Sequence, residues 1–197
     1  MPKIVDYEKR RKDIIQKALY VFAKNGYHST RFSDIAKRCK MGRTSLYQYF
    51  KNKEDIFSNV VNHIMATLRV ELQKILNSEE LSCTAKLKKI VQRLGHKFSE
   101  KQNMMIILID FKILLSREES ELGQELKRYS KELRSAFENV LKKGIESGEI
   151  RQIDPGSMAA TITVLVESII LKASFKGDVS MKEHLTNIDI LLKSLQV

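Results

Sequence analysis

Hydrophobic residues recur at helical spacing along most of the chain. The longest such pattern follows Lys53, where apolar positions repeat every three or four residues until Asn77. This stripe consists of Ile56, Phe57, Val60, Val61, Ile64, Met65, Leu68, Leu72 and Ile75. No stretch shows the clear apolar–polar alternation of a half-buried strand. The pattern therefore predicts an all-α protein with about nine helices.

Residues with capping chemistry mark the expected helix boundaries. Gly26 suits the end of the first helix, and Thr30 is expected as the N-cap of the second. Asn52 is expected to cap the long fourth helix, with Asp55 reaching back as in a capping box. Asp154 is the expected N-cap of the eighth helix. The expected helices cover residues 7–24, 31–40, 43–50, 53–76, 82–100, 103–116, 119–147, 155–175 and 181–195.

The composition agrees with a helical, globular chain. Of 197 residues only 8 are Gly and 2 are Pro, which leaves few turn-forming residues for a many-stranded fold. The longest strictly apolar run, 104–109, is far shorter than the roughly 20 residues of a membrane span. The start of the chain has no apolar stretch of signal-peptide type, and its two cysteines form no disulfide framework. We therefore expect a cytoplasmic protein without a membrane partner.

Positive charge is concentrated at the beginning of the chain. Residues 1–53 hold 14 Lys and Arg against 4 Asp and Glu, a net charge of +10 out of +11 for the whole chain. A basic block of this kind indicates an anionic partner at one end, first a nucleic acid and second a membrane surface. The run from Lys9 to Lys12 either contacts phosphates or forms an ordinary solvated helix face.

Two short helices, separated by a break at Met41-Gly42, lie inside this basic block with helix-turn-helix spacing over 31–50. Leu46 and Phe50 are expected to face inward and anchor the second helix. Its other faces carry side chains suited to DNA, because Arg pairs with guanine, Gln with adenine, and Thr with a thymine methyl or a phosphate. The residues expected to contact DNA are Thr30, Arg31, Arg43, Thr44, Tyr47, Gln48, Tyr49 and Lys53. Tyr49 can equally pack against its own domain.

The same region carries a run of short motifs at fixed spacing. They are Phe22-Ala23-Lys24-Asn25-Gly26-Tyr27, Thr30, Asp34-Ile35-Ala36, Leu46-Tyr47-Gln48-Tyr49-Phe50 and Lys53-Glu54. In order and spacing these resemble the DNA-binding domain of the tetracycline-repressor (TetR) family over about 50 residues. The stretch before Leu46 departs from the family pattern, with Gly42 where a capping Ser is usual and with Lys40 and Thr44 replacing glycines. These differences affect which base sequence the helix prefers, and they leave the helix-turn-helix motif itself intact.

The resemblance implies a domain organisation and a function. It implies a helix-turn-helix DNA-binding domain at 7–67 and an effector-binding and dimerisation domain at 68–197. It further implies a homodimeric transcriptional regulator, usually a repressor, that a small molecule releases from double-stranded operator DNA. An architectural DNA-binding protein without an effector is the alternative.

The last two expected helices differ from the others. Residues 155–175 are apolar almost all the way round, so this helix needs cover on two sides. A second subunit can supply one side, although both helices can instead belong to the core of a single subunit. The expected dimer contacts are Ile162, Val166, Ile169, Ile188, Leu191, Leu192 and Leu195.

Polar groups on otherwise apolar faces are the candidates for an effector pocket among the middle helices. They are His63, His96, Asp110, Tyr129 and Glu167. Asp110 either points into the pocket, where it favours a cationic ligand, or points outward with its helical neighbours. Glu167 can line the pocket or meet the partner subunit.

Catalytic and metal-binding signatures are missing from the sequence. The chain lacks the glycine-rich nucleotide motifs and the H-E-x-x-H motif, and its four His and two Cys are scattered without ligand spacing. We therefore expect neither an enzyme nor a cofactor, and no metal site.

Overall fold

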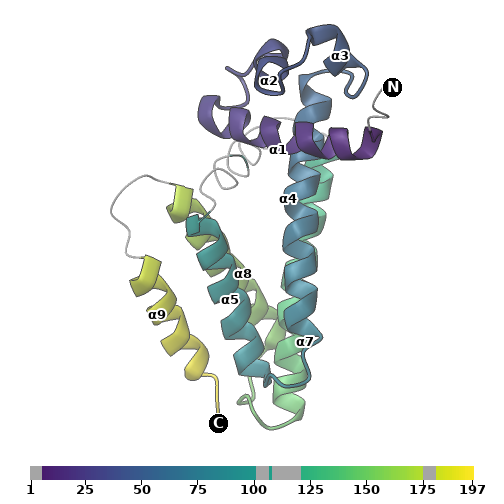
Figure 1. Ribbon diagram of the computed structural model, residues 1–197. Helices are drawn as coiled ribbons and strands as arrows, with labels where there is room; N and C mark the ends of the chain where they lie inside the picture. Colours follow the sequence, from purple (N-terminus) through teal and green to yellow (C-terminus); the bar gives the residue numbers. More distant parts are fainter. Residues whose placement is uncertain (1–5, 101–106, 108–120, 175–180) are drawn as a thin grey trace.

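A computed structural model describes residues 6–100, 107, 121–174 and 181–197 (Figure 1). These residues form helices, and the β-type pairing among them is one isolated bridge between Ile150 and Gln196. The all-α prediction is confirmed. The described helices are α1 (Tyr7–Asn25), α2 (Phe32–Arg38), α3 (Arg43–Tyr47), α4 (Lys53–Leu76), α5 (Cys83–Glu100), α7 (Glu121–Glu146), α8 (Pro155–Ser174) and α9 (Met181–Lys193). The expected helix at 103–116 lies outside the described residues.

The long helix α4 connects two parts of the molecule. Helices α1, α2 and α3 gather around its N-terminal end, and its C-terminal half enters a bundle with α5 and α7 (Figure 1). All nine residues of the stripe predicted for this helix are buried. One continuous apolar face therefore serves both the N-terminal helices and the bundle.

The bundle is built from antiparallel neighbours. The short connection between α7 and α8 lays these two helices side by side, and α9 packs on α5 (Figure 1). Buried side chains from each helix meet in its core, among them Leu87, Phe137, Ala159 and Leu192. No helix among the described residues is both long enough and apolar enough to cross a membrane.

Two predicted caps are as expected. Gly26 ends α1 with φ 76° and ψ 163°, a conformation that essentially only glycine tolerates. It allows Tyr27 to turn back onto Phe22, with 6.1 Å between the ring centroids. At α8, the carboxylate of Asp154 accepts the backbone N–H of Ser157 at 3.0 Å. Both positions fix where the chain enters or leaves a helix.

Two other caps differ from the prediction. Arg31, not Thr30, is the N-cap of α2, because the Thr30 hydroxyl points back to the Gly26 carbonyl at 2.7 Å. At α4 the Asn52 side chain accepts the Asp55 N–H at 2.8 Å as expected. The Asp55 carboxylate, however, reaches Lys51 N–H at 2.9 Å instead of closing the capping box on Asn52.

Candidate DNA interface and effector site

The second helix of the helix-turn-helix packs on the rest of its domain through apolar and aromatic contacts. Helix α3 spans Arg43–Tyr47, shorter than the predicted 43–50, and Leu46 is its buried anchor. The Tyr47 ring stacks on Phe32 of α2, with 4.5 Å between centroids and 27° between planes. Phe50, beyond the end of α3, is also buried, as predicted.

The outer face of α3 carries four of the side chains predicted to contact DNA. Arg43, Thr44, Tyr47 and Gln48 are all exposed. The Arg43 guanidinium lies 5.6 Å from the centre of the Tyr47 ring and donates to the Tyr47 hydroxyl at 3.1 Å. Two of the side chains predicted to contact DNA are therefore in contact with each other.

Lys53 is bound within the domain. Its ammonium group donates to the carbonyls of Tyr27 at 2.9 Å and of His28 at 3.3 Å, and lies 4.4 Å from the centre of the Tyr27 ring. This places the charge beside the loop between α1 and α2 and uses two of the three donors of the ammonium group. Lys53 therefore holds the α1–α2 loop against the start of α4. The DNA contact of Lys53 stays a prediction.

Two further residues predicted to contact DNA differ in exposure, since Arg31 lies at the surface and Thr30 in the interior. Arg31 is exposed, and its backbone N–H donates to the Asp34 carboxylate at 2.9 Å. Thr30 is only 1% exposed and its hydroxyl is used internally. A buried side chain cannot reach a groove, so we leave Thr30 out of the proposed interface.

Tyr49 packs within its own domain, which was one of its two predicted placements. Its ring is half-buried and stacks on Tyr7 of α1, with 4.9 Å between centroids and 19° between planes. The Tyr7 hydroxyl donates to the Gln48 carbonyl at 3.2 Å. Tyr7 was not among the predicted residues, because no local signal places the first turn of α1 beside a residue 41 positions later.

The basic run at the start of α1 has two different sides. Arg10 donates to Asp13 at 3.2 Å, and Arg11 donates to Asn59 at 3.0 Å while lying over the Phe50 ring. Lys9 and Lys12 are exposed. The side chains of Arg10 and Arg11 are therefore bound within the domain, and a phosphate contact by the two exposed lysines stays a prediction.

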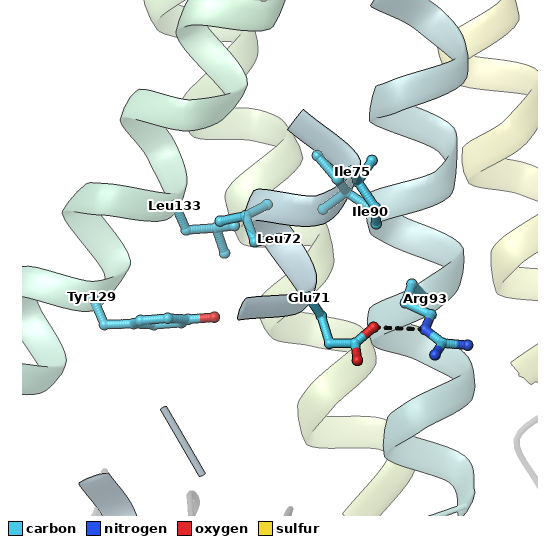
Figure 2. Close-up of a pocket in the computed structure, with 7 residues that line it drawn as sticks. All are labelled: Glu71, Leu72, Ile75, Ile90, Arg93, Tyr129 and Leu133. Atoms are coloured by element: carbon cyan, nitrogen blue, oxygen red, sulfur yellow. Dashed lines mark hydrogen bonds and ion pairs between the residues drawn. The ribbon is translucent and has the colours of Figure 1, made fainter. Parts of the chain in front are cut away.

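A small cavity lies between α4, α5 and α7 (Figure 2). Its lining combines four aliphatic side chains with Tyr129 and an ion pair in which Arg93 Nε lies 3.1 Å from Glu71 Oε2. The aliphatic members are Leu72, Ile75, Ile90 and Leu133. Its volume of about 10 Å³ is enough for roughly one water molecule. Burial raises the pKa of Tyr129 to about 12, so this phenol is neutral at physiological pH.

The structure brings one of the predicted pocket residues to this cavity. Tyr129 lines it, whereas His63 is exposed on α4 and does not. Glu167, half-buried on α8, accepts a hydrogen bond from the Ser130 hydroxyl at 3.2 Å and is not part of the lining. Asp110 and the side chain of His96 lie outside the described part of the chain. Helical spacing missed Glu71 and Arg93, because their partnership depends on how α4 meets α5.

The predicted dimer contacts mostly belong to the core of the single subunit. The buried members are Ile162, Val166, Ile188, Leu192 and Leu195. Leu191 is half-buried, and the side chain of Ile169 is outside the described residues. Because α8 is apolar nearly all round, its sequence did not reveal which side faces inward. The exposed positions on the two helices include Val164 and Ile190, at 64% and 60% exposure.

Among the described residues, no group of three or more His, Cys, Asp or Glu side chains is arranged to hold a metal ion.

This chain is similar in sequence to known bacterial regulators. Residues 14–60 match the family model described as bacterial regulatory proteins of the tetR family. The fatty acid metabolism regulator protein of Bacillus subtilis is 29% identical over 139 residues, covering 71% of this chain and 70% of that protein.

Solved structures share the fold over nearly the whole length. The regulator FadR from Bacillus subtilis, crystallised in complex with stearoyl-CoA, has a TM-score of 0.76 at 24% identity, covering 92% of this chain and 96% of that one. A TetR-family regulator from Rhodococcus sp. has a TM-score of 0.79 at 20% identity, covering 95% and 98%. These relatives are transcriptional regulators and not enzymes. Residues 14–60 therefore match the tetR family of bacterial regulatory proteins, and the fold of the described chain is that of TetR-family structures.

Proposed function

We propose that this regulator is a homodimeric repressor that binds a near-palindromic operator and leaves it when a small molecule enters the helical bundle. The observation that carries the proposal is the exposed face of α3, where Arg43, Thr44, Tyr47 and Gln48 stand on a helix anchored by Leu46. These side chains suit direct reading of base edges in a major groove. Residues 7–67 act as the DNA-binding domain, and residues 68–197 bind the effector and dimerise.

The dimer uses the exposed faces of the last two helices. Val164 of α8 lies in a row of exposed, mostly small side chains with Ser157, Thr161 and Ser168. Small side chains allow a helix of a second copy to come close, and a two-fold axis repeats the contact. Two recognition helices then meet successive major grooves about 34–36 Å apart.

The effector belongs to the long-chain acyl-CoA class. Two relatives support this assignment, because one is a fatty acid metabolism regulator and the other was crystallised with stearoyl-CoA. The aliphatic lining of the cavity between α4, α5 and α7 suits an acyl chain. Room for one water molecule does not admit such a chain, so binding must move α4 away from α5 or α7. Because α4 continues into the DNA-binding domain, the same movement reorients α3.

The experiment begins with operator selection from a random-sequence duplex library. The wild-type chain should enrich one near-palindromic sequence and protect it in a footprint. An architectural protein would instead coat the duplex without a defined boundary. Stearoyl-CoA should then release the selected duplex in a fluorescence-polarisation titration, while coenzyme A alone should leave it bound. Release by neither compound would remove the acyl-CoA assignment and leave the DNA assignment intact.

A further inference from the structure

The first turn of α1 is attached to the end of the recognition helix α3. The Tyr7 hydroxyl donates to the Gln48 carbonyl oxygen at 3.2 Å, and the Tyr7 ring stacks on Tyr49 at 4.9 Å. Residue 48 is the C-cap of α3, and residue 49 follows it. One tyrosine therefore contacts the two residues at which α3 ends.

Helix α3 needs such support because it has only five helical residues. An isolated helix shorter than about 12 residues is not stable in water, since its few hydrogen bonds do not offset the entropy of fixing the backbone. The last carbonyls of any helix also lack partners within it. Tyr7 supplies a donor to one of these carbonyls and an aromatic surface beside it.

Tyr7 is itself held in place by the start of α1. The Asp6 side chain accepts the Lys9 N–H at 3.2 Å, and the Asp6 carbonyl accepts the Arg10 N–H at 2.9 Å. The cap fixes Tyr7 as the first residue of the helix. At the other end of this connection, the Gln48 side chain is exposed on the face of α3 that we assign to base reading.

We propose that Tyr7 is a positioning residue for sequence discrimination, acting by fixing the backbone of Gln48 relative to the rest of the DNA-binding domain. This inference rests on the proposed function. A hydrogen bond to a base requires its donor to be placed within a few tenths of an ångström, whereas a phosphate accepts donors from many directions. Loosening the end of α3 therefore reduces binding to the preferred sequence more than binding to DNA in general.

The test compares three variants of the full chain. Tyr7→Phe removes the hydroxyl and keeps the ring, and Tyr7→Ala removes both. Tyr20→Ala is the matched control, because Tyr20 lies on the same helix at 43% exposure against 47% for Tyr7. The contact recorded for the Tyr20 ring is with Arg38 of α2, whose guanidinium carbon lies 4.5 Å from the ring centre. Dissociation constants are measured for the duplex that the wild type enriches most and for a shuffled duplex of the same composition.

The measured quantity is the ratio of the two affinities, together with the slope of log K against log salt for the enriched duplex. Tyr7→Ala should lower the ratio about tenfold and Tyr7→Phe about threefold, in line with the loss of one aromatic pair and one hydrogen bond. The salt slope should stay unchanged, because these substitutions remove no Lys or Arg charge from the phosphates. Tyr20→Ala should keep the wild-type ratio.

Two results would overturn the inference while the proposed function stands. An unchanged ratio in Tyr7→Phe and Tyr7→Ala means that α3 is positioned without this contact. Equal loss of both affinities means that Tyr7 supports binding to DNA in general and not discrimination between sequences. If Tyr7→Ala fails to fold, the ratio of Tyr7→Phe decides alone. A wild type that enriches no sequence removes the proposed function, and the inference with it.

Discussion

The carboxylate of Glu149 caps helix α5, which begins 66 residues earlier, and accepts the backbone N–H of Thr84 at 2.8 Å. It also accepts the N–H of Cys83 at 2.8 Å, so both oxygens sit at the N-terminus of α5. The chain end joins the same cluster, since the Gln196 amide donates to the Thr84 hydroxyl at 3.0 Å. The Glu149 carboxylate thus joins the α7–α8 connection to the start of α5, and Gln196 joins this cluster through Thr84.

Replacing this carboxylate should weaken the bundle in a pH-dependent way. Burial by itself raises the pKa of Glu149, but hydrogen bonds from Thr84, Ser82 and Cys83 outweigh burial and hold the pKa at about 2. The lowered pKa means that the stabilisation is complete above about pH 5 and is lost as the pH falls toward 2. Glu149→Gln should lower the free energy of unfolding by about 1–2 kcal/mol at pH 7.

Denaturant unfolding at several pH values checks this prediction. The difference between the wild type and Glu149→Gln should shrink as the pH is lowered from 5 toward 2. Glu146→Gln is the control, because Glu146 is an exposed glutamate in the last turn of α7. A difference that does not depend on pH would contradict the assigned role of the charge.

Removing the charge of Lys53 should reduce DNA binding by loosening the loop between α1 and α2. Lys53→Met keeps most of the aliphatic stem but releases the carbonyls of Tyr27 and His28. We expect several-fold weaker binding to every duplex with an unchanged salt slope. Lys74→Met is the control for the lost positive charge, because Lys74 is an exposed lysine in the last turn of α4. A slope reduced by about 0.9 would instead show a direct phosphate contact by Lys53.

Arg43 and Tyr47 should behave as a coupled pair in DNA recognition. Arg43→Ala should relax base choice at one operator position by about 1–3 kcal/mol, measured against all four base pairs there. Tyr47→Phe keeps the stack on Phe32 but removes the hydroxyl that Arg43 contacts, so it should weaken part of the same discrimination. Additive effects in the double variant would disprove the coupling.

The exposed and buried sides of the last two helices should respond differently to an added charge. Val164→Arg should give a folded monomer, with a light-scattering mass near 22.8 kDa instead of twice that value. Leu192→Arg should lose the fold, because it buries an unpaired charge in the core at a cost of about 4 kcal/mol or more. Val70→Arg, an exposed valine on α4, is the control and should stay dimeric. A dimeric Val164→Arg would place the interface elsewhere.

Local patterning was sufficient for several elements of this protein. The nine stripe residues of α4, the buried Leu46 and Phe50, and the caps at Gly26 and Asp154 were all predicted from spacing and residue type. Each depends on interactions within a few residues or on a single apolar face, and such preferences are encoded locally. The motifs between Phe22 and Glu54 likewise identified the family without any coordinates.

The sequence by itself determined the helices, the helix-turn-helix and its outward side chains. Tertiary structure decided which partners those helices meet. Lys53 donates a hydrogen bond to the loop carbonyl of Tyr27, Tyr49 stacks on Tyr7, and Glu149 accepts a backbone N–H of α5. It also decided which side of α8 faces the core, since a helix that is apolar all round gives no local signal for one side over another. Contacts between residues 26 to 65 positions apart depend on how helices pack, and periodicity along one helix does not specify packing between two.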